Sequence, residues 1–121
     1  MFIKRTQDCP THIAIDGCTI REVLQPARDT LGLPYSLAVA EVAVGAHTYR
    51  HRLEHTEVYY LLAGRGLMHI ENETAEVVVG DAVTIPAHAV QWIENTGHEI
   101  LRFIALVNPP WTIEVDQRCD P

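Results

Sequence analysis

Histidine and glutamate residues are concentrated in one short segment of this 121-residue chain. Residues 45–64 have the sequence GAHTYRHRLEHTEVYYLLAG, which contains His47, His51, His55 and Glu57. All four positions are odd-numbered, and residues of one parity point to the same side of an extended chain. Imidazole nitrogens and carboxylate oxygens are ligands for Zn, Mn, Fe, Ni or Cu, and they also serve in acid–base catalysis. The segment therefore predicts a site for one of these two kinds of chemistry.

A second segment, residues 80–95, has the sequence GDAVTIPAHAVQWIEN. Together the two segments resemble the motifs of the cupin family, G-x5-H-x-H-x3-E-x6-G and G-x5-P-x-G-x2-H-x3-N. The residues that match at the motif spacings are Gly45, His51, Glu57, Gly64, Gly80, Pro86 and Asn95. The resemblance extends over about residues 19–111, and it is closest to small single-barrel cupins without an assigned function.

Three positions depart from these motifs. Leu53 and Gln91 stand where the family has histidine ligands, and His88 stands where it has glycine. The family site has three histidines and one glutamate, and a leucine cannot bind a metal. The resemblance therefore carries only His51 and Glu57 over to this chain, with Gln91 as a weak, neutral oxygen ligand.

Two further histidines can supplement this reduced set. His55 lies two residues before Glu57 and can stand in for the histidine that Leu53 replaces, while His47 can reach the cavity from the strand entrance. The predicted ligands of this weak, degenerate divalent-metal site are His51, Glu57, Gln91 and His55. The identity of the ion stays open among Zn, Mn, Fe, Ni and Cu, and no organic cofactor is expected.

The same residues also suit chemistry without a metal. Buried His51, Glu57 and Gln91 can form a hydrogen-bonded network with water. In apolar surroundings the pKa of Glu57 rises, so its carboxyl can act as a general acid or base. Tyr59 shares the inward parity and can add a hydroxyl donor. This alternative assigns catalysis to Glu57, His51 and Tyr59, and the residues expected to line the substrate pocket are His47, Tyr49, Leu53 and Leu61.

The elements that must position these residues are short β-strands. Apolar runs alternate with Gly, Pro, Asn and Asp along the chain, which is typical of a sandwich or barrel. The expected strands are 12–15, 18–24, 35–44, 57–63, 66–71, 75–79, 82–86, 90–94, 99–107 and 111–115. One helical turn is expected within residues 22–33, and a tight hairpin at residues 63–66.

These strands and the resemblance predict an all-β fold, the cupin double-stranded β-helix or jelly-roll barrel, antiparallel, with short N-terminal and C-terminal extensions. One domain is expected over residues 1–121, with N-terminal strands in 1–18, the barrel core in about 19–107 and a tail in 108–121. Neither Pro109 nor Pro110 can donate a ladder hydrogen bond, so the tail should leave the sheet and cross the barrel surface or its mouth. Trp111 is then a lid, a subunit contact or a filler of the shell.

Composition and charge exclude several classes of function. Sixteen Asp and Glu residues against nine Lys and Arg give a net charge of −7, which argues against a nucleic-acid partner. No apolar run reaches the ~20 residues of a membrane span, and no signal peptide is recognisable, so a cytoplasmic location is expected. Cys9, Cys18 and Cys119 form no C-x-x-C pair and are expected to be free thiols.

Several functions remain open at this level. The leading hypothesis is a small cupin that binds a small molecule in its barrel and has a degenerate metal site. The alternatives are a metal-dependent dioxygenase, lyase or isomerase; a metal-free acid–base enzyme such as an epimerase or cyclase; and a non-catalytic sensor or dimerisation module.

A homodimer is expected as well. By parity Trp92, Tyr60 and Leu62 point outward and would form an apolar patch, and such patches commonly mark interfaces. With the resemblance, this patch implies two barrels back to back, with N-terminal strands added to the partner's sheet.

Overall fold

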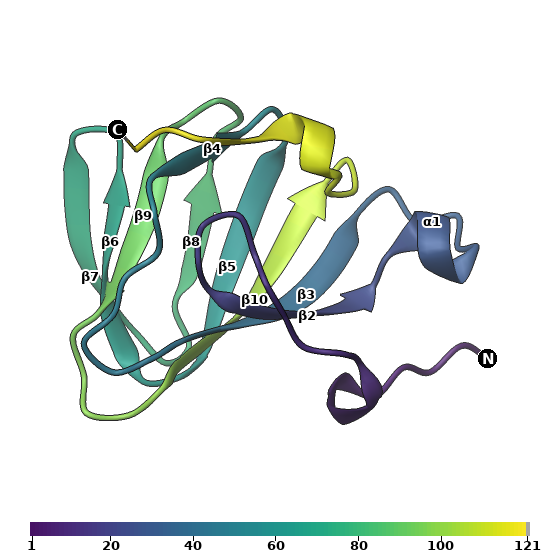
Figure 1. The fold of residues 1–121 in the computed structure, drawn as a ribbon, viewed down its shortest axis with the longest axis horizontal. Coiled ribbons are helices and arrows are strands. Elements are labelled where there is room, and N and C mark those ends of the chain that lie inside the picture. The colour runs from purple at the N-terminus through teal and green to yellow at the C-terminus, as the bar shows by residue number, and fades with distance from the viewer. Residues whose placement is uncertain (121) are drawn as a thin grey trace.

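The chain folds into two antiparallel β-sheets that face each other (Figure 1). The structure is a computed structural model and describes residues 1–120. In spatial order, the six-stranded sheet contains β1 (His12–Ile13), β2 (Thr19–Leu24), β3 (Ser36–Val42), β10 (Leu101–Asn108), β5 (Thr56–Ala63) and β8 (Ala82–Ile85). The five-stranded sheet contains β11 (Asp116–Arg118), β4 (His51–Leu53), β9 (Gln91–Asn95), β6 (Arg65–Ile70) and β7 (Glu73–Val78). The predicted all-β jelly-roll architecture is confirmed.

Alternation along the strands builds the core between the two sheets. On β5, Glu57, Tyr59 and Leu61 are buried, whereas Tyr60 and Leu62 on the opposite face are 44% and 41% exposed. The same period of two recurs on β9 and β10. The largest fully buried apolar side chains are Phe103, Leu53, Leu61, Ile85, Ile93 and Leu101. The inward parity predicted for β5 is therefore confirmed.

The predicted hairpin at residues 63–66 is wrong. β5 and β6 follow one another in the chain but lie in different sheets, because β5 pairs with β10 and β8 while β6 pairs with β7 and β9. Gly64, between them, has φ of +81°, and a Cβ atom there would lie 2.8 Å from the Ile100 carbonyl oxygen. Gly64 therefore lies where the chain crosses from one sheet to the other, in a conformation and a space that a larger residue would not fit.

Two further expectations for strands need correction. Residues 111–115 form a loop and the 3-10 helix η2 (Ile113–Val115), and the strand β11 begins only at Asp116. The chain also forms β4 at His51–Leu53, a strand too short for its apolar pattern to indicate. By contrast, the helical turn within residues 22–33 is confirmed as α1 (Pro26–Asp29). Pro26 lies at the start of this helix, where its missing N–H group costs little.

The segments at both ends of the chain each add a strand to the barrel, although the N-terminus itself projects away from it (Figure 1). The N-terminal segment contains the 3-10 helix η1 (Thr6–Asp8) and β1, which pairs with β2 of its own chain. After β10 the C-terminal segment, yellow in Figure 1, crosses one end of the barrel and returns as β11 against β4. Within residues 1–120, no helix is long and apolar enough to span a membrane.

Candidate functional site

A cavity of about 310 Å³ lies within the barrel and opens beside the N-terminal and C-terminal segments. Apolar side chains from β2, β3 and β10 form most of its wall, among them Ile20, Leu37, Ala40, Phe103 and Val107. Ionisable side chains converge at its inner end, namely Asp16, His51, Glu57 and Asp116. A cavity with an apolar wall and a few convergent polar groups is typical of a small-molecule site.

His51 is placed at this inner end by β4, and its side chain is 5% exposed. The Nδ1 atom lies 3.0 Å from Asp116 Oδ1 and forms a hydrogen bond with it. The Nε2 atom lies 3.4 Å from Asp16 Oδ2 and has no hydrogen-bond partner among residues 1–120. Burial lowers the pKa of His51, but the bond with Asp116 and the charges of Asp16, Asp116 and Glu57 outweigh this effect and raise it.

The two aspartates that flank His51 come from opposite ends of the chain. β11 pairs with β4 and thereby places Asp116 beside His51, and Asp116 Oδ2 also accepts a hydrogen bond of 2.9 Å from Trp111 Nε1. Asp16 lies in the turn before β2, where its Oδ1 accepts a 3.0 Å hydrogen bond from the Cys18 N–H group. The pairing of β11 with β4 and the hydrogen bond from the Cys18 N–H group to Asp16 hold the two carboxylates at the imidazole ring.

Glu57 faces the same end of the cavity from β5 in the opposite sheet. Its Oε1 accepts a hydrogen bond of 2.9 Å from Gln91 Nε2, and Gln91 Oε1 accepts one of 3.0 Å from the Tyr59 hydroxyl. Burial raises the pKa of Glu57 to about 7, against the lowering effects of His51 and Gln91. Near neutral pH the carboxyl is therefore populated in both its protonated and ionised forms, which suits a general acid or base.

The structure brings together only part of the predicted pocket. Leu53 and Tyr59 line the cavity beside His51 and Glu57. Leu61 does not line it, because this side chain is 0% exposed and packs in the hydrophobic core. Gln91 is 1% exposed and lies behind the wall, where it links Glu57 to Tyr59.

Three more predicted site residues, besides Leu61 and Gln91, lie outside the cavity. His55 falls in the turn between β4 and β5, where the alternation is interrupted, and its Nδ1 lies 2.8 Å from the Pro109 carbonyl oxygen. His47 is exposed ahead of β4, and its ring packs against Trp92 with the centroids 5.5 Å apart. Tyr49 is 38% exposed, and its ring lies under the Arg118 guanidinium, 3.6 Å from Cζ to centroid.

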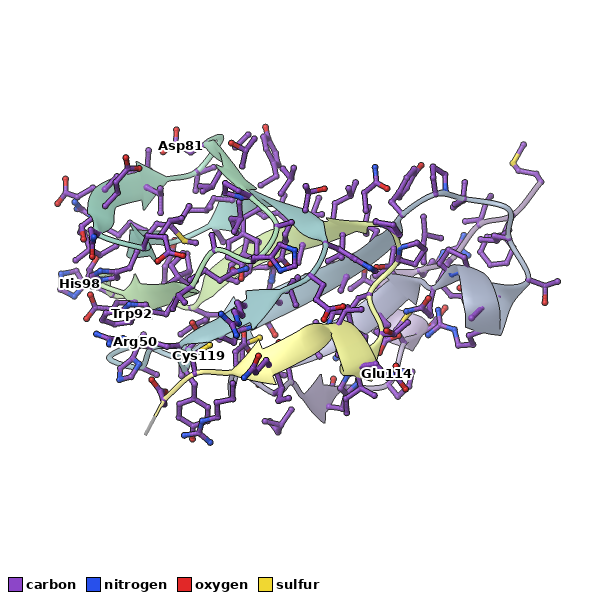
Figure 2. The ribbon with its side chains drawn as sticks, turned by 90° about the horizontal axis from the view of Figure 1, so that it is seen from above. Arg50, Asp81, Trp92, His98, Glu114 and Cys119 are labelled. Atoms are coloured by element: carbon purple, nitrogen blue, oxygen red, sulfur yellow. The ribbon has the colours of Figure 1, made fainter. Side chains whose placement is uncertain are left out.

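The predicted patch of Trp92 with Tyr60 and Leu62 is also wrong. β9 carries Trp92 on the five-stranded sheet, whereas Tyr60 and Leu62 lie on the six-stranded sheet. The ring of Trp92 stacks on His69 at 3.7 Å between centroids, and the Arg50 guanidinium lies 5.4 Å from its centroid. Figure 2 shows Trp92 and Arg50 beside each other.

The donor atoms of the site do not fit the four-ligand metal centre that the resemblance implies. Leu53 has no donor atom, and both ends of the Gln91 amide are engaged with Glu57 and Tyr59. His55 is held at Pro109, away from Glu57. Among residues 1–120, no three His, Cys, Asp or Glu side chains are arranged to hold a metal ion. His51 and Glu57 remain as the two potential ligands at matched positions.

The third departure from the motifs, His88, is at a position with an unusual backbone conformation. Its φ is +70°, the left-handed conformation that glycine adopts without strain, and its N–H group donates a hydrogen bond of 2.6 Å to the Leu53 carbonyl. His88 therefore adopts a left-handed conformation at the position where the motif has glycine.

Sequence reasoning missed Asp16 and Asp116, the two carboxylates that contact His51. Asp16 precedes Gly17 in a turn, and Asp116 lies in the tail, so neither has a spacing that relates it to the histidine segment. Only the pairing of β11 with β4 reveals the second contact.

Comparisons with known proteins agree with this architecture. A family model described as "Cupin domain" matches residues 38–107. The chain is 41% identical over 104 residues to an uncharacterised protein of Methanocaldococcus jannaschii, covering 85% of this chain and 82% of that protein. A Thermotoga maritima structure described as a predicted oxalate decarboxylase has a TM-score of 0.77 at 20% identity, covering 89% of this chain and 99% of its own. The polyketide cyclase of Streptomyces resistomycificus has a TM-score of 0.78 at 20% identity, covering 100% of this chain and 87% of its own.

Proposed function

This chain belongs to the cupin domain family, and we propose that it binds a small, largely apolar molecule in the barrel cavity and exchanges a proton with it through Glu57 and His51. The observation that carries this proposal is the pair of ionisable groups at the inner end of the cavity. Glu57 has a pKa of about 7 there, and His51 Nε2 has no hydrogen-bond partner among residues 1–120. A buried, unpaired nitrogen costs free energy unless a ligand or water satisfies it.

The two groups can act together on one ligand. The ionised Glu57 carboxylate accepts a proton from the ligand, and the protonated His51 ring donates a hydrogen bond or a proton to a neighbouring ligand atom. Gln91 orients Glu57 from behind the cavity wall, and Asp116 orients His51 from within the inner end of the cavity. Both directions of proton transfer are available near neutral pH because both forms of Glu57 are populated there.

Decarboxylation of oxalate receives no support from the cavity. Oxalate is a dianion, and none of the cavity-lining side chains of residues 1–120 is a lysine or arginine. The likeness to the Thermotoga structure, at 20% identity, is one of fold alone.

A cavity-filling variant tests the proposed binding. Ala38 lines the cavity on β3, so Ala38→Phe should fill it, while Ala75→Phe, at an exposed position of β7 that does not line this cavity, is the matched control. A fragment library is screened by ligand-observed NMR against both variants and the wild type. We expect fragments that bind the wild type and Ala75→Phe and are lost from Ala38→Phe. An absence of cavity binders, or equal binding to Ala38→Phe, would contradict the proposal.

Removal of metal ions distinguishes the proposed metal-free proton transfer from a metal-dependent enzyme. With only His51 and Glu57 as potential ligands at matched positions, we expect weak binding of divalent ions. Tag-free protein should contain substoichiometric metal by elemental analysis, and dialysis against a chelator should leave fragment affinities unchanged. Stoichiometric metal, or loss of binding after chelation that Zn or Mn restores, would favour the metal-dependent enzyme.

A further inference from the structure

The ionisable side chains that line the cavity are unbalanced in charge. Four of them are carboxylates, namely Asp16, Glu22, Glu57 and Asp116. Against these stand only the imidazoles of His12 and His51, since no lysine or arginine among residues 1–120 lines the cavity. Low-dielectric walls strengthen the potential of such a group, so the cavity attracts cations and repels anions.

The inner end also keeps unused hydrogen-bond acceptors. Both oxygens of Asp116 are engaged, by His51 and by Trp111. Glu57, in contrast, uses Oε1 alone within residues 1–120, and Asp16 Oδ2 faces His51 Nε2 at 3.4 Å without forming a hydrogen bond. A ligand head that reaches this end therefore meets two carboxylate oxygens and one buried imidazole nitrogen, which lies within ion-pair distance of Asp16 but has no hydrogen-bond partner among residues 1–120.

The rest of the cavity suits an apolar body. Ile13 and Ile113 line the cavity and yet are 69% and 63% exposed, which places them at its mouth. Between the mouth and the inner end the wall is mainly aliphatic, and its aromatic members are Tyr59, Phe103 and Trp111. A ligand that enters head first thus buries its apolar part against this wall and its polar head against the carboxylates.

We propose that the ligand of this cavity is a small organic cation, with an apolar body and a protonated amine head that the Asp16 and Glu57 carboxylates bind. This inference rests on the proposed function, because it assigns a ligand class to the same cavity. An ammonium head donates up to three hydrogen bonds and accepts none, which matches the free oxygens of Asp16 and Glu57, while His51 Nε2 stays directed at Asp16 Oδ2 or at another atom of the ligand. A carboxylate head would instead meet charges of its own sign.

A matched series of probes tests the head group. Benzylamine, benzyl alcohol and phenylacetate share a benzyl body and differ in charge, and their affinities are measured at pH 7.5 by ¹H–¹⁵N NMR titration, with the Trp111 indole as a reporter at the cavity wall. We expect benzylamine to bind about tenfold or more tightly than benzyl alcohol, because a charge-assisted hydrogen bond is stronger than a neutral one. Phenylacetate should bind weakest.

Two variants test which carboxylates produce the preference for benzylamine over benzyl alcohol. Asp16→Asn removes the charge but keeps the oxygen that accepts the Cys18 N–H bond, and it should weaken benzylamine binding about tenfold with little effect on benzyl alcohol. Glu57→Gln repeats the test should Asp16→Asn not fold. Glu76→Gln, whose side chain is 77% exposed on β7, is the control with the same loss of charge and should behave like the wild type.

The outcomes separate the two proposals. If phenylacetate or benzyl alcohol binds as tightly as benzylamine, the cation assignment is overturned while small-molecule binding stands. If none of the three probes shifts the resonances of cavity residues, small-molecule binding in this cavity is itself overturned, and the cation assignment with it.

Discussion

The surroundings of the Glu57 carboxyl favour its protonated form. The carboxyl faces His51, Asp16 and Asp116, accepts a hydrogen bond from Gln91, and has a pKa raised from 4.5 to about 7 chiefly by burial. The folded protein therefore keeps this proton up to about pH 7, whereas the unfolded chain loses it near pH 4.5. The stabilisation from this group is fully present below pH 4.5 and is lost as the pH rises through 7.

Glu57→Gln should remove this dependence on pH. We expect the free energy of unfolding of the wild type to fall relative to that of Glu57→Gln between pH 5 and pH 8, by up to about 3 kcal/mol. Urea denaturation at several pH values measures the difference. Glu76→Gln, at an exposed position, is the control that should parallel the wild type. Parallel curves for the wild type and Glu57→Gln would show that the Glu57 carboxyl ionises normally.

Asp116 acts on His51 through its hydrogen bond to Nδ1. Asp116→Asn removes one of the three carboxylates that raise the His51 pKa, leaving Asp16 and Glu57. We expect the pKa of His51 to fall in this variant, as followed by the His51 ring resonances in an NMR titration. Glu114→Gln, exposed on the same tail, should leave that pKa unchanged. An unchanged His51 pKa in Asp116→Asn would show that Asp116 does not control the ionisation of His51.

At the scale of elements, the site depends on crossings between sheets rather than on hairpins. β4 and β5 are separated by a turn of two residues, yet they lie in different sheets, so His51 and Glu57 face one cavity from opposite walls. The Gly64 crossing then returns the chain from β5 to β6 and lets β5 pair with β10 and β8. The position of Glu57 thus depends on two tight crossings.

Gly64→Ala should destabilise the barrel. The residue has φ of +81°, and an added Cβ atom would lie 2.8 Å from the Ile100 carbonyl oxygen, which is rigid backbone. We expect a loss of about 1–2 kcal/mol in the free energy of unfolding from the left-handed conformation alone, and more from the contact. Gly32→Ala, with nothing within 4 Å of the new Cβ, is the control and should change stability little. Equal stabilities of the two variants would refute this role for Gly64.

At the scale of the whole molecule, part of the outer face of the six-stranded sheet is apolar and exposed, beside the ion pair of Arg102 with Glu41. Tyr60 and Leu62 are 44% and 41% exposed on β5. Ile104 lies opposite Tyr60, and Val39 lies opposite Ile104, both partly buried. We propose that a second copy of this chain covers this face, because an exposed apolar patch of several adjacent side chains commonly marks an interface.

Charged substitutions on this face test the homodimer. We expect a dimer for the wild type in size-exclusion chromatography with light scattering, and a monomer for the double variant Tyr60→Lys with Leu62→Lys. Val79→Lys, at a residue 57% exposed outside this face, should remain dimeric as the control. A wild-type monomer at micromolar concentration would exclude a stable interface on this sheet.

The candidate site could be predicted only in part from the sequence. The period of two along β5 placed Glu57 and Tyr59 on the buried face, because local alternation is a property of the strand itself. His55 and His47 share that parity, but parity applies only within a continuous strand, and both residues lie outside one. Leu61 shares it as well, yet the inward face of β5 passes from the cavity into the packed core along its length.

The sequence by itself determined the β architecture, the inward residues of β5 and the two matched polar positions, His51 and Glu57, because these follow from local periodicity and motif spacing. Only the tertiary structure decided which charges surround them. Asp16 and Asp116 are 100 positions apart in the chain (116 − 16), and they meet at His51 because the turn before β2 and the strand β11 both pack against the same end of the barrel. Contacts between such distant segments depend on strand register across the fold, which no local spacing encodes.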